Sequence, residues 1–238
     1  MKVLITGSNG FIGRNLVSKL EKIDNIEIIT FNIEDSFDKI ENNINSIDII
    51  FHLAGVMRPK DPKEFYEVNT NLTKRIIDLI ISKNLSIPVI LTSSVHALTD
   101  TDYGKSKKMA EDIIINYGNN SNVFRLTNAF GKWARPNASS VIATFCYNIS
   151  HNLDIKVDET AEINFIYIDD IIKEFVNIML GNNPSNKEGN ICSIKPTYRV
   201  KIKDLAETLY KFKSGNYDNL NEFEMRLLDT YNSYKEME

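Results

Sequence analysis

The sequence predicts an α/β fold: a Rossmann-like doubly wound parallel sheet with a small, mostly helical C-terminal lobe. Strand-like and helix-like stretches alternate through residues 1–130, an order that favours parallel strands covered by helices on both faces. A glycine-rich turn joins the first strand to the first helix. Helical patterns dominate residues 131–238. We therefore place one division at residue 130, between a sheet domain and a lobe that are intertwined in one structural unit.

The expected strands are short runs of aliphatic and β-branched residues, and the expected helices repeat apolar residues on one face. In chain order the first half gives a strand at 2–6, a helix at 11–23, a strand at 26–31, a helix at 35–46, a strand at 48–55, a helix at 63–83, a strand at 87–93, a helix at 103–117 and a strand at 122–127. The second half gives helices at 139–150, 169–180, 201–213 and 219–234, and short strands near 163–167 and 190–195.

The composition is ordinary for a globular protein. The 238 residues are 42% hydrophobic and 25% charged, with a net charge of −4 at pH 7. This balance disfavours nucleic acid as a partner, and no apolar run reaches transmembrane length. Cys146 and Cys192 have no metal-ligand spacing with the three histidines, so we expect buried free thiols and no metal site. The N-terminus lacks signal-peptide features, so we expect a cytoplasmic protein.

The stretch TGSNGFIG, from Thr6 to Gly13, lies between the first expected strand and the first expected helix. Gly7 lets the chain turn sharply, and the two later glycines let a pyrophosphate approach backbone N–H groups without a Cβ in the way. The helix that follows points the positive end of its dipole at such an anion. This pattern in this context predicts a dinucleotide site.

The end of the second expected strand, TFNIED, is where such folds distinguish NAD from NADP. It has no aspartate at the strand tip to hold a ribose diol and no arginine to hold a 2′-phosphate. Asn32 is our candidate for a ribose contact, and Glu34 or Asp35 for an adenine contact. The expected cofactor is NADP(H) or NAD(H), and the sequence leaves the choice open.

Tyr103 and Lys107 are four residues apart and share one face of an expected helix. A free phenol has a pKa of about 10, which a neighbouring ammonium and a cationic nicotinamide would lower. Ser94 ends the preceding strand and is placed to bond a substrate oxygen, with Ser93 as the alternative. Asp102 is a plausible N-cap of the helix. This set predicts proton transfer between the tyrosine and a substrate oxygen.

With these motifs in this order, the chain resembles the extended, sugar-nucleotide-modifying branch of the short-chain dehydrogenase/reductase superfamily. The motifs that carry the resemblance are TGSNGFIG, HLAG at 52–55, Asn69 in EVNTNL, LTSS, YGKSK, RLTNAFG at 125–131 and YIDD at 167–170. The resemblance implies that residues 1–130 bind NAD(P) and that residues 131–238 bind the substrate. It also implies that Ser94, Tyr103 and Lys107 are catalytic.

The residues and the resemblance together assign binding contacts. Those expected for the dinucleotide come from the glycine loop, the second strand, the 53–55 turn and the tyrosine–lysine helix. They are Gly7, Asn9, Gly10, Phe11, Ile12, Gly13, Asn32, Leu53, Ala54, Gly55, Tyr103 and Lys107. The expected substrate contacts are Ser94, His96, Asn128, Trp133 and Arg135, with a loop role for His96 and lobe packing for Trp133 as alternatives. Asn69 and Asp169 are implied to be structural.

Three stretches narrow the resemblance to the reductase domain of bacterial capsular polysaccharide enzymes that make N-acetyl-L-fucosamine precursors. They are FGKWARPNASSVIATFCYNIS at 130–150, LAGVMRP at 53–59 and LYKFK at 209–213. Those enzymes continue into a C-terminal cupin domain, which we do not expect in this chain. The resemblance therefore implies reduction without epimerisation, and a separate cupin-type epimerase is a candidate partner.

We expect an NAD(P)H-dependent reductase of a 4-keto-6-deoxy nucleotide sugar, of the UDP-2-acetamido-2,6-dideoxy-hexulose type, in capsular polysaccharide or surface-glycan biosynthesis. The alternatives are a nucleotide-sugar 4-epimerase and a non-catalytic nucleotide-binding protein on the same scaffold. A 4,6-dehydratase is disfavoured because Val95 and His96 stand where its acid–base pair is typically found. Apolar faces on the helices at 63–83 and 103–117 suggest a homodimer, with burial inside one subunit as the competing account.

Overall fold

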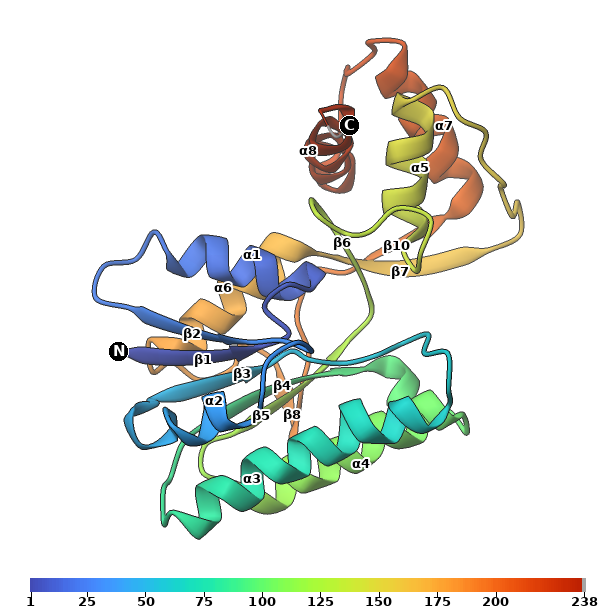
Figure 1. Ribbon diagram of the computed structural model, residues 1–238. Helices are drawn as coiled ribbons and strands as arrows, with labels where there is room; N and C mark the ends of the chain where they lie inside the picture. The colour runs from blue at the N-terminus through green and yellow to red at the C-terminus, as the bar shows by residue number, and fades with distance from the viewer. Residues whose placement is uncertain (237–238) are drawn as a thin grey trace. The chain divides into compact units, whose positions relative to one another are not determined.

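The computed structural model describes residues 1–236, which form two compact units (Figure 1). Unit 1 consists of residues 1–126 and 172–194, and unit 2 of residues 127–171 together with the chain from Lys195 onward. The sequence predicted a single division at residue 130. In the structure the chain instead returns to unit 1 for residues 172–194 before it completes unit 2.

Unit 1 is built on a seven-stranded sheet in the order β2-β1-β3-β4-β5-β9-β8. Its strands are β1 (Lys2–Thr6), β2 (Glu27–Phe31), β3 (Ile49–His52), β4 (Val89–Ser94), β5 (Asn122–Leu126), β8 (Lys187–Glu188) and β9 (Ile191–Cys192). Neighbouring strands are parallel except at the β8–β9 edge. The five strands expected in the first half are all present, and the predicted doubly wound α/β fold is confirmed.

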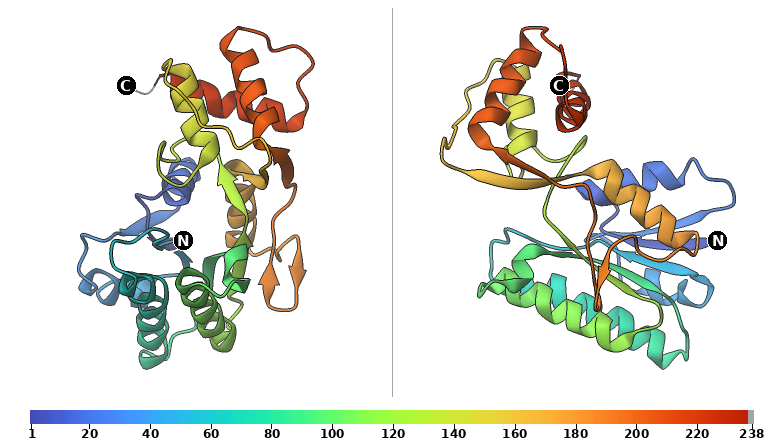
Figure 2. Two further views of the ribbon diagram at one scale, coloured as in Figure 1. Left: turned by 90° about the vertical axis from the view of Figure 1, so that its right-hand side faces the viewer. Right: turned by 180° about the vertical axis from the view of Figure 1, so that it is seen from behind.

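Helices cover both faces of this sheet (Figures 1 and 2). The helix α1 (Phe11–Leu20) and the unit 1 part of α6 (Ile168–Met179) lie on one face, and α3 (Leu72–Ser82) and α4 (Asp102–Tyr117) on the other. Under α6, the Phe175 ring lies 5.7 Å from the Phe51 ring and 5.4 Å from the Phe124 ring, centroid to centroid. These contacts tie α6 to the central strands by apolar burial.

Two helices differ from the sequence-based expectation. Residues 35–46 form only the short α2 (Asp38–Glu41) and a 3₁₀ turn, η1 (Ile44–Ser46). Asparagines occupy positions 42 and 43 between them, and asparagine is a poor helix former. Residues 63–83 begin with a π-helical segment, η2 (Phe65–Asn71), and only then continue as α3. Such π-helical segments are frequent at functional sites.

The start of α4 also differs in detail. Its N-cap is Thr101, whose Oγ1 accepts a hydrogen bond from the Gly104 N–H at 3.0 Å. Asp102, the expected cap, is instead the first helical residue, and its carboxylate accepts a hydrogen bond from the Tyr66 hydroxyl at 3.1 Å. Before α4 the chain forms one 3₁₀ turn, η3 (Val95–Leu98).

Unit 2 joins three helices to a three-stranded sheet in the order β10-β7-β6. Its elements are β6 (Asn128–Phe130), α5 (Val141–Ser150), β7 (Glu162–Tyr167), β10 (Tyr198–Lys201), α7 (Ile202–Lys213) and α8 (Glu222–Lys235). The unit is mostly helical, as expected, but β6 and β10 were not expected, because strands of three and four residues are too short for their pattern to distinguish them from loops. No helix within residues 1–236 has the length and apolar character of a membrane span.

Candidate functional site

The glycine loop between β1 and α1 is too crowded for side chains at two of its three glycines. A Cβ on Gly7, where φ is +68°, would lie 2.7 Å from the Ala54 nitrogen. A Cβ on Gly13 would lie 2.2 Å from the Gly7 carbonyl oxygen, whereas one on Gly10 would lie 3.1 Å from that oxygen. Gly10 caps α1 without a side chain, so the first N–H groups of the helix are available to an anion. The loop therefore fits a pyrophosphate, and it packs against the 53–55 turn.

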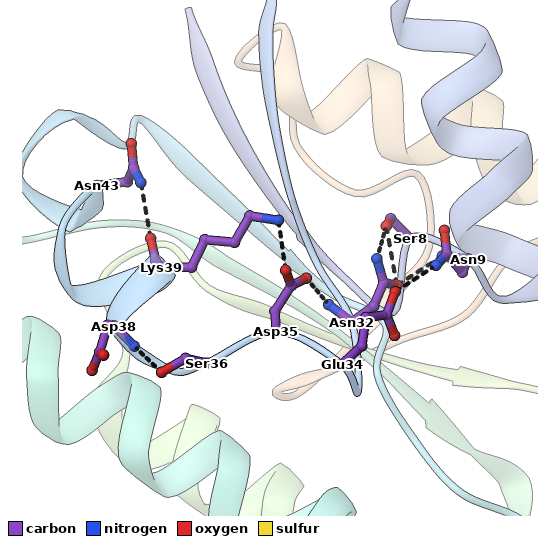
Figure 3. Close-up of polar contacts among 9 residues, drawn as sticks. All are labelled: Ser8, Asn9, Asn32, Glu34, Asp35, Ser36, Asp38, Lys39 and Asn43. Atoms are coloured by element: carbon purple, nitrogen blue, oxygen red, sulfur yellow. Dashed lines mark hydrogen bonds and ion pairs between the residues drawn. The ribbon is translucent and has the colours of Figure 1, made fainter.

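Asn32 follows β2 and is bonded to the glycine loop (Figure 3). Its Oδ1 accepts hydrogen bonds from the Asn9 N–H at 2.9 Å and the Ser8 hydroxyl at 3.1 Å, and its Nδ2 lies 2.8 Å from the same hydroxyl. Asn9 also donates from Nδ2 to a carboxylate oxygen of Glu34 at 3.1 Å. The expected ribose residue thus also fixes the shape of the loop beside it.

Asp35 links the end of β2 to α2. Its carboxylate accepts hydrogen bonds from the Asn32 N–H at 2.8 Å and from Lys39 Nζ at 2.9 Å. These bonds, the lysine's first, lower the pKa of Asp35. Lys39 is thereby paired with a carboxylate near the position where NADP-binding proteins carry a cation for the 2′-phosphate.

Tyr103 and Ser94 meet where β4 ends and α4 begins. Burial raises the pKa of the Tyr103 phenol, and a hydrogen bond with Ser94 acts in the opposite direction. The Ser94 hydroxyl also accepts a hydrogen bond from the His96 N–H at 3.2 Å. Rings of Phe65 and His96 flank the phenol at centroid distances of 5.8 and 6.2 Å. The structure therefore gives a phenol that keeps its proton at neutral pH beside a strand-end hydroxyl.

Lys107 lies one turn along α4 from the tyrosine and is only 5% exposed. Its Nζ donates to the Thr92 carbonyl oxygen at 2.7 Å and lies 3.6 Å from where a Cβ on Gly55 would be. Burial lowers the pKa of this lysine to about 8, against an opposing contribution from Glu111. The ammonium was expected to lower the pKa of Tyr103. Burial outweighs any such effect in the structure, and the ammonium instead faces a backbone carbonyl.

A buried ion pair under the tyrosine–lysine face was not anticipated from the sequence. Glu111, which is fully buried, accepts hydrogen bonds from Arg125 Nε at 2.9 Å and from a second Arg125 nitrogen at 2.7 Å. Ser93 donates to the same carboxylate at 2.6 Å. Ser93, the alternative to Ser94, thus points into this network. No local spacing in the sequence signals this pair, because Glu111 lies on α4 and Arg125 on β5.

Two further polar side chains hold the strand ends together below the site. Asn69, in the π-helical segment, accepts a hydrogen bond from the Val56 N–H at 2.9 Å and so holds the turn after β3. His52 bridges the Thr6 hydroxyl at 2.7 Å and the Thr73 hydroxyl at 2.9 Å. Burial lowers the pKa of His52 to about 3. This histidine is therefore neutral at physiological pH and acts as a structural link between β1, β3 and α3.

Three of the expected substrate residues belong to unit 2. Asn128 is exposed at the start of β6, and its Nδ2 lies 3.3 Å from the Asn164 carbonyl oxygen. Trp133 is half-buried and Arg135 is exposed in the loop that follows β6. The structure thus brings Ser94, Tyr103 and Lys107 together in unit 1, while Asn128, Trp133 and Arg135 lie in unit 2.

Cys146 and Cys192 are buried free thiols, as expected. Burial raises the pKa of both, that of Cys192 to about 11, so neither is a ready nucleophile at neutral pH. Within residues 1–236, no three histidine, cysteine, aspartate or glutamate side chains gather in a way that could hold a metal ion.

A parallel sheet that opens with a crowded glycine loop, beside a tyrosine–lysine helix, defines a dinucleotide-binding protein of the Rossmann class. The chain belongs to the NAD dependent epimerase/dehydratase family, whose model matches residues 3–192. This membership confirms the resemblance to the extended short-chain dehydrogenases that the sequence motifs suggested.

Individual relatives agree with the resemblance to the reductase domain of capsular polysaccharide enzymes. The chain is 42% identical over 222 residues to the UDP-2-acetamido-2,6-beta-L-arabino-hexul-4-ose reductase of Pseudomonas aeruginosa, a match covering 90% of this chain and 58% of the relative. It superposes on the capsular polysaccharide assembling protein CapF from Staphylococcus aureus with a TM-score of 0.87 and 35% identity, covering 98% of this chain and 66% of CapF. The chain thus spans less than two thirds of the length of these relatives.

A further solved structure resembles this chain over almost the full length of both chains. Its sequence identity is low, so this likeness shows the fold alone. The UDP-glucuronic acid 4-epimerase of Bacillus cereus, solved with NAD, superposes with a TM-score of 0.78 over 99% of each chain, at 19% identity. The chain therefore shares its fold with this epimerase.

Proposed function

We propose that this chain is an NAD(P)H-dependent reductase of a 4-keto-6-deoxy nucleotide sugar, of the UDP-2-acetamido-2,6-dideoxy-hexulose type. The observation that carries the proposal is the contact of Ser94 with Tyr103 one helical turn before the buried Lys107, beside a glycine loop that fits a pyrophosphate. The identity of 42% to a named hexul-4-ose reductase supports the substrate class. The likeness to CapF supports a role in capsular polysaccharide or surface-glycan biosynthesis.

The chain's part in the reaction is to deliver a proton. When bound, the reduced nicotinamide supplies a hydride to the keto carbon. Tyr103 donates its phenolic proton to the keto oxygen, which becomes the product hydroxyl, and Ser94 holds that oxygen by a hydrogen bond. Burial raises the pKa of Tyr103, so the phenol carries this proton at neutral pH. The phenolate then regains a proton from solvent.

Lys107 has two roles in this proposal. Its ammonium holds the nicotinamide ribose and stabilises the transient phenolate one turn away. The remaining cofactor contacts come from Gly7, Asn9, Gly10, Phe11, Ile12, Asn32, Leu53, Ala54 and Gly55. The close packing of the loop supports this assignment, because a Cβ on Gly7 or Gly13 would lie within 3 Å of backbone atoms of the loop or the 53–55 turn. The substrate is contacted by Ser94, His96, Asn128, Trp133 and Arg135.

The test is a reduction assay with product identification. Oxidation of NADH and of NADPH is followed against a panel of UDP-4-keto-6-deoxy sugars, with Tyr103→Phe as the matched inactive control. We expect the protein to purify without bound cofactor and to form the 4-hydroxy sugar with either NADH or NADPH. Stoichiometric bound NAD, together with interconversion of 4-epimers without added cofactor, would replace the reductase assignment with the 4-epimerase alternative.

The proposal includes a cytoplasmic homodimer formed by the 63–83 and 103–117 helices. Ile81 on α3 is 57% exposed and Met109 on α4 is 48% exposed, so both helices present apolar side chains outward. We expect light scattering to give twice the monomer mass, and Ile81→Glu with Met109→Glu to give the monomer mass. A parent protein that stays monomeric at micromolar concentration would refute the dimer. A separate cupin-type epimerase, which would have to act on the keto sugar before its reduction, would be found by co-purification.

A further inference from the structure

The loop after β6 contains the most unusual backbone conformation in residues 1–236. Across residues 1–236, eight residues other than glycine have positive φ. Seven of them are asparagine, which tolerates the left-handed region. The eighth is Trp133, with φ of +71°. A bulky aromatic residue in this region is a genuine outlier, and such conformations persist only where surrounding structure enforces them.

The structure shows what enforces this conformation. The fully buried Tyr234 of α8 donates its hydroxyl proton to the Ala134 carbonyl oxygen at 2.5 Å, with the Gly131 carbonyl oxygen 3.3 Å away. Gly131 has φ of +145°, and a Cβ there would lie 2.2 Å from Cγ2 of Ile168. The loop is therefore fixed on both sides of the tryptophan, at residue 131 and at residue 134.

The side chains on this fixed loop have a shared chemistry. Lys132 Nζ lies 4.5 Å from the centroid of the Trp133 ring, so a cation already sits against one face of the indole. The ring is half-buried, and Arg135 is exposed two residues later. A flat aromatic surface stacks on a nucleobase, and neighbouring cations bind phosphates. An aromatic ring and two cations within four residues therefore match the base and the phosphates of a nucleoside diphosphate.

We propose that Trp133 is a preset stacking surface for the base of a nucleoside diphosphate, and that Tyr234 is the positioning residue that holds it in place. The inference rests on the proposed function in one respect, the nucleotide part of the substrate. It deepens that function by assigning base recognition to unit 2 and to a tyrosine of the C-terminal helix. Lys132 and Arg135 supply the positive charge for the diphosphate.

The chain offers a direct readout, because Trp133 is its only tryptophan. Titration of the full chain with UDP alone should change the intrinsic fluorescence of Trp133 in a saturable way, and pyrophosphate alone should not. Trp133→Ala should weaken UDP binding by about tenfold or more, measured by calorimetry, as expected for loss of one stacking contact. Binding of NAD(H) and NADP(H) should be unchanged in that variant.

Tyr234→Phe removes one hydroxyl and keeps the buried ring. We expect it to weaken UDP binding by about 3- to 10-fold, the usual effect of one neutral hydrogen bond. It should also raise KM for the nucleotide sugar with kcat nearly unchanged, and shift the emission maximum of Trp133. The matched control is Tyr231→Phe, on the same helix and equally buried, where the ring packs on Phe212 at 6.1 Å. This control should leave UDP binding and emission unchanged.

Separate outcomes test the inference and the proposed function. UDP binding of parental strength in both Trp133→Ala and Tyr234→Phe, or failure of the parent to bind UDP, overturns the inference even if the parent reduces a keto sugar. Conversely, UDP binding that depends on both residues supports the inference even if no keto sugar is reduced. If Tyr234→Phe and Tyr231→Phe weaken UDP binding equally, the effect is a general one on α8. That result would also overturn the inference.

Discussion

Replacing Arg125 by methionine tests whether the buried ion pair holds the reaction face of α4 in place. The Glu111 carboxylate has no exposed surface and takes two of its three hydrogen bonds from Arg125, whose side chain is 20% exposed. Arg125→Met leaves this carboxylate in the interior with Ser93 as its remaining hydrogen-bond donor. Removing one partner of a buried ion pair typically costs about 3–5 kcal/mol of unfolding free energy, and we expect the upper part of that range.

The double variant separates a buried charge from lost packing. In Glu111→Gln with Arg125→Met the charge is gone, and the amide oxygen of the new glutamine can still accept the Ser93 hydrogen bond. We therefore expect the double variant to regain about 1–3 kcal/mol relative to Arg125→Met. Urea unfolding followed by far-ultraviolet circular dichroism measures all four proteins of the cycle. If the double variant is no more stable than Arg125→Met, the buried charge is not the cause and the reasoning fails.

Three other predictions concern the site itself. Gly13→Ala should abolish dinucleotide binding, because its Cβ would lie 2.2 Å from a backbone oxygen, whereas Gly10→Ala, at 3.1 Å, should weaken it far less; calorimetric titration compares the two. Tyr103→Phe should keep the fold and cofactor affinity but lower turnover by about 10²–10⁴-fold, and near-normal turnover would contradict its role as the acid. Lys107 has a pKa of about 8 in the folded protein against an ordinary lysine pKa of 10.5, so the buried ammonium destabilises the fold below pH 8. Between these two pH values the unfolded chain binds more protons, so the stability of the parent relative to Lys107→Met should rise with pH, by up to about 3 kcal/mol. A stability difference that stays flat over this window would contradict the lowered pKa.

The sequence predicted the features of unit 1 that depend on local pattern. Aliphatic runs located β1 to β5 within one to three residues, and the glycine spacing located the loop whose crowding the structure shows. The same patterns could not locate what depends on distant contacts. Glu111 and Arg125 are fourteen residues apart on different elements, and nothing local marks them as partners. The hydrogen bond from the Val56 N–H to Asn69, in the π-helical segment before α3, likewise joins residues thirteen positions apart.

Unit 2 was harder to predict for a related reason. Strands β6 and β10 are short and acquire strand geometry by pairing with β7, in opposite directions. The return of residues 172–194 to unit 1 has no composition signal, because it is set by the packing of Phe175 on Phe51 and Phe124. The left-handed Trp133 was also outside local reasoning, since its conformation depends on a hydroxyl about a hundred residues later in the chain.

The path of the chain between the units constrains how this protein can be divided or rebuilt. Three covalent connections, after Leu126, Ile171 and Ile194, join unit 1 to unit 2. A fragment ending at Leu126 would lack β9, which pairs with β5, and the α6 residues that cover Phe51 and Phe124. Such a fragment would expose an unpaired strand edge and an uncovered aromatic surface, both of which favour aggregation. A single proteolytic cut at any one connection leaves the other two intact, so exchange of unit 2 between relatives requires two matched segments joined at three points rather than one fusion point.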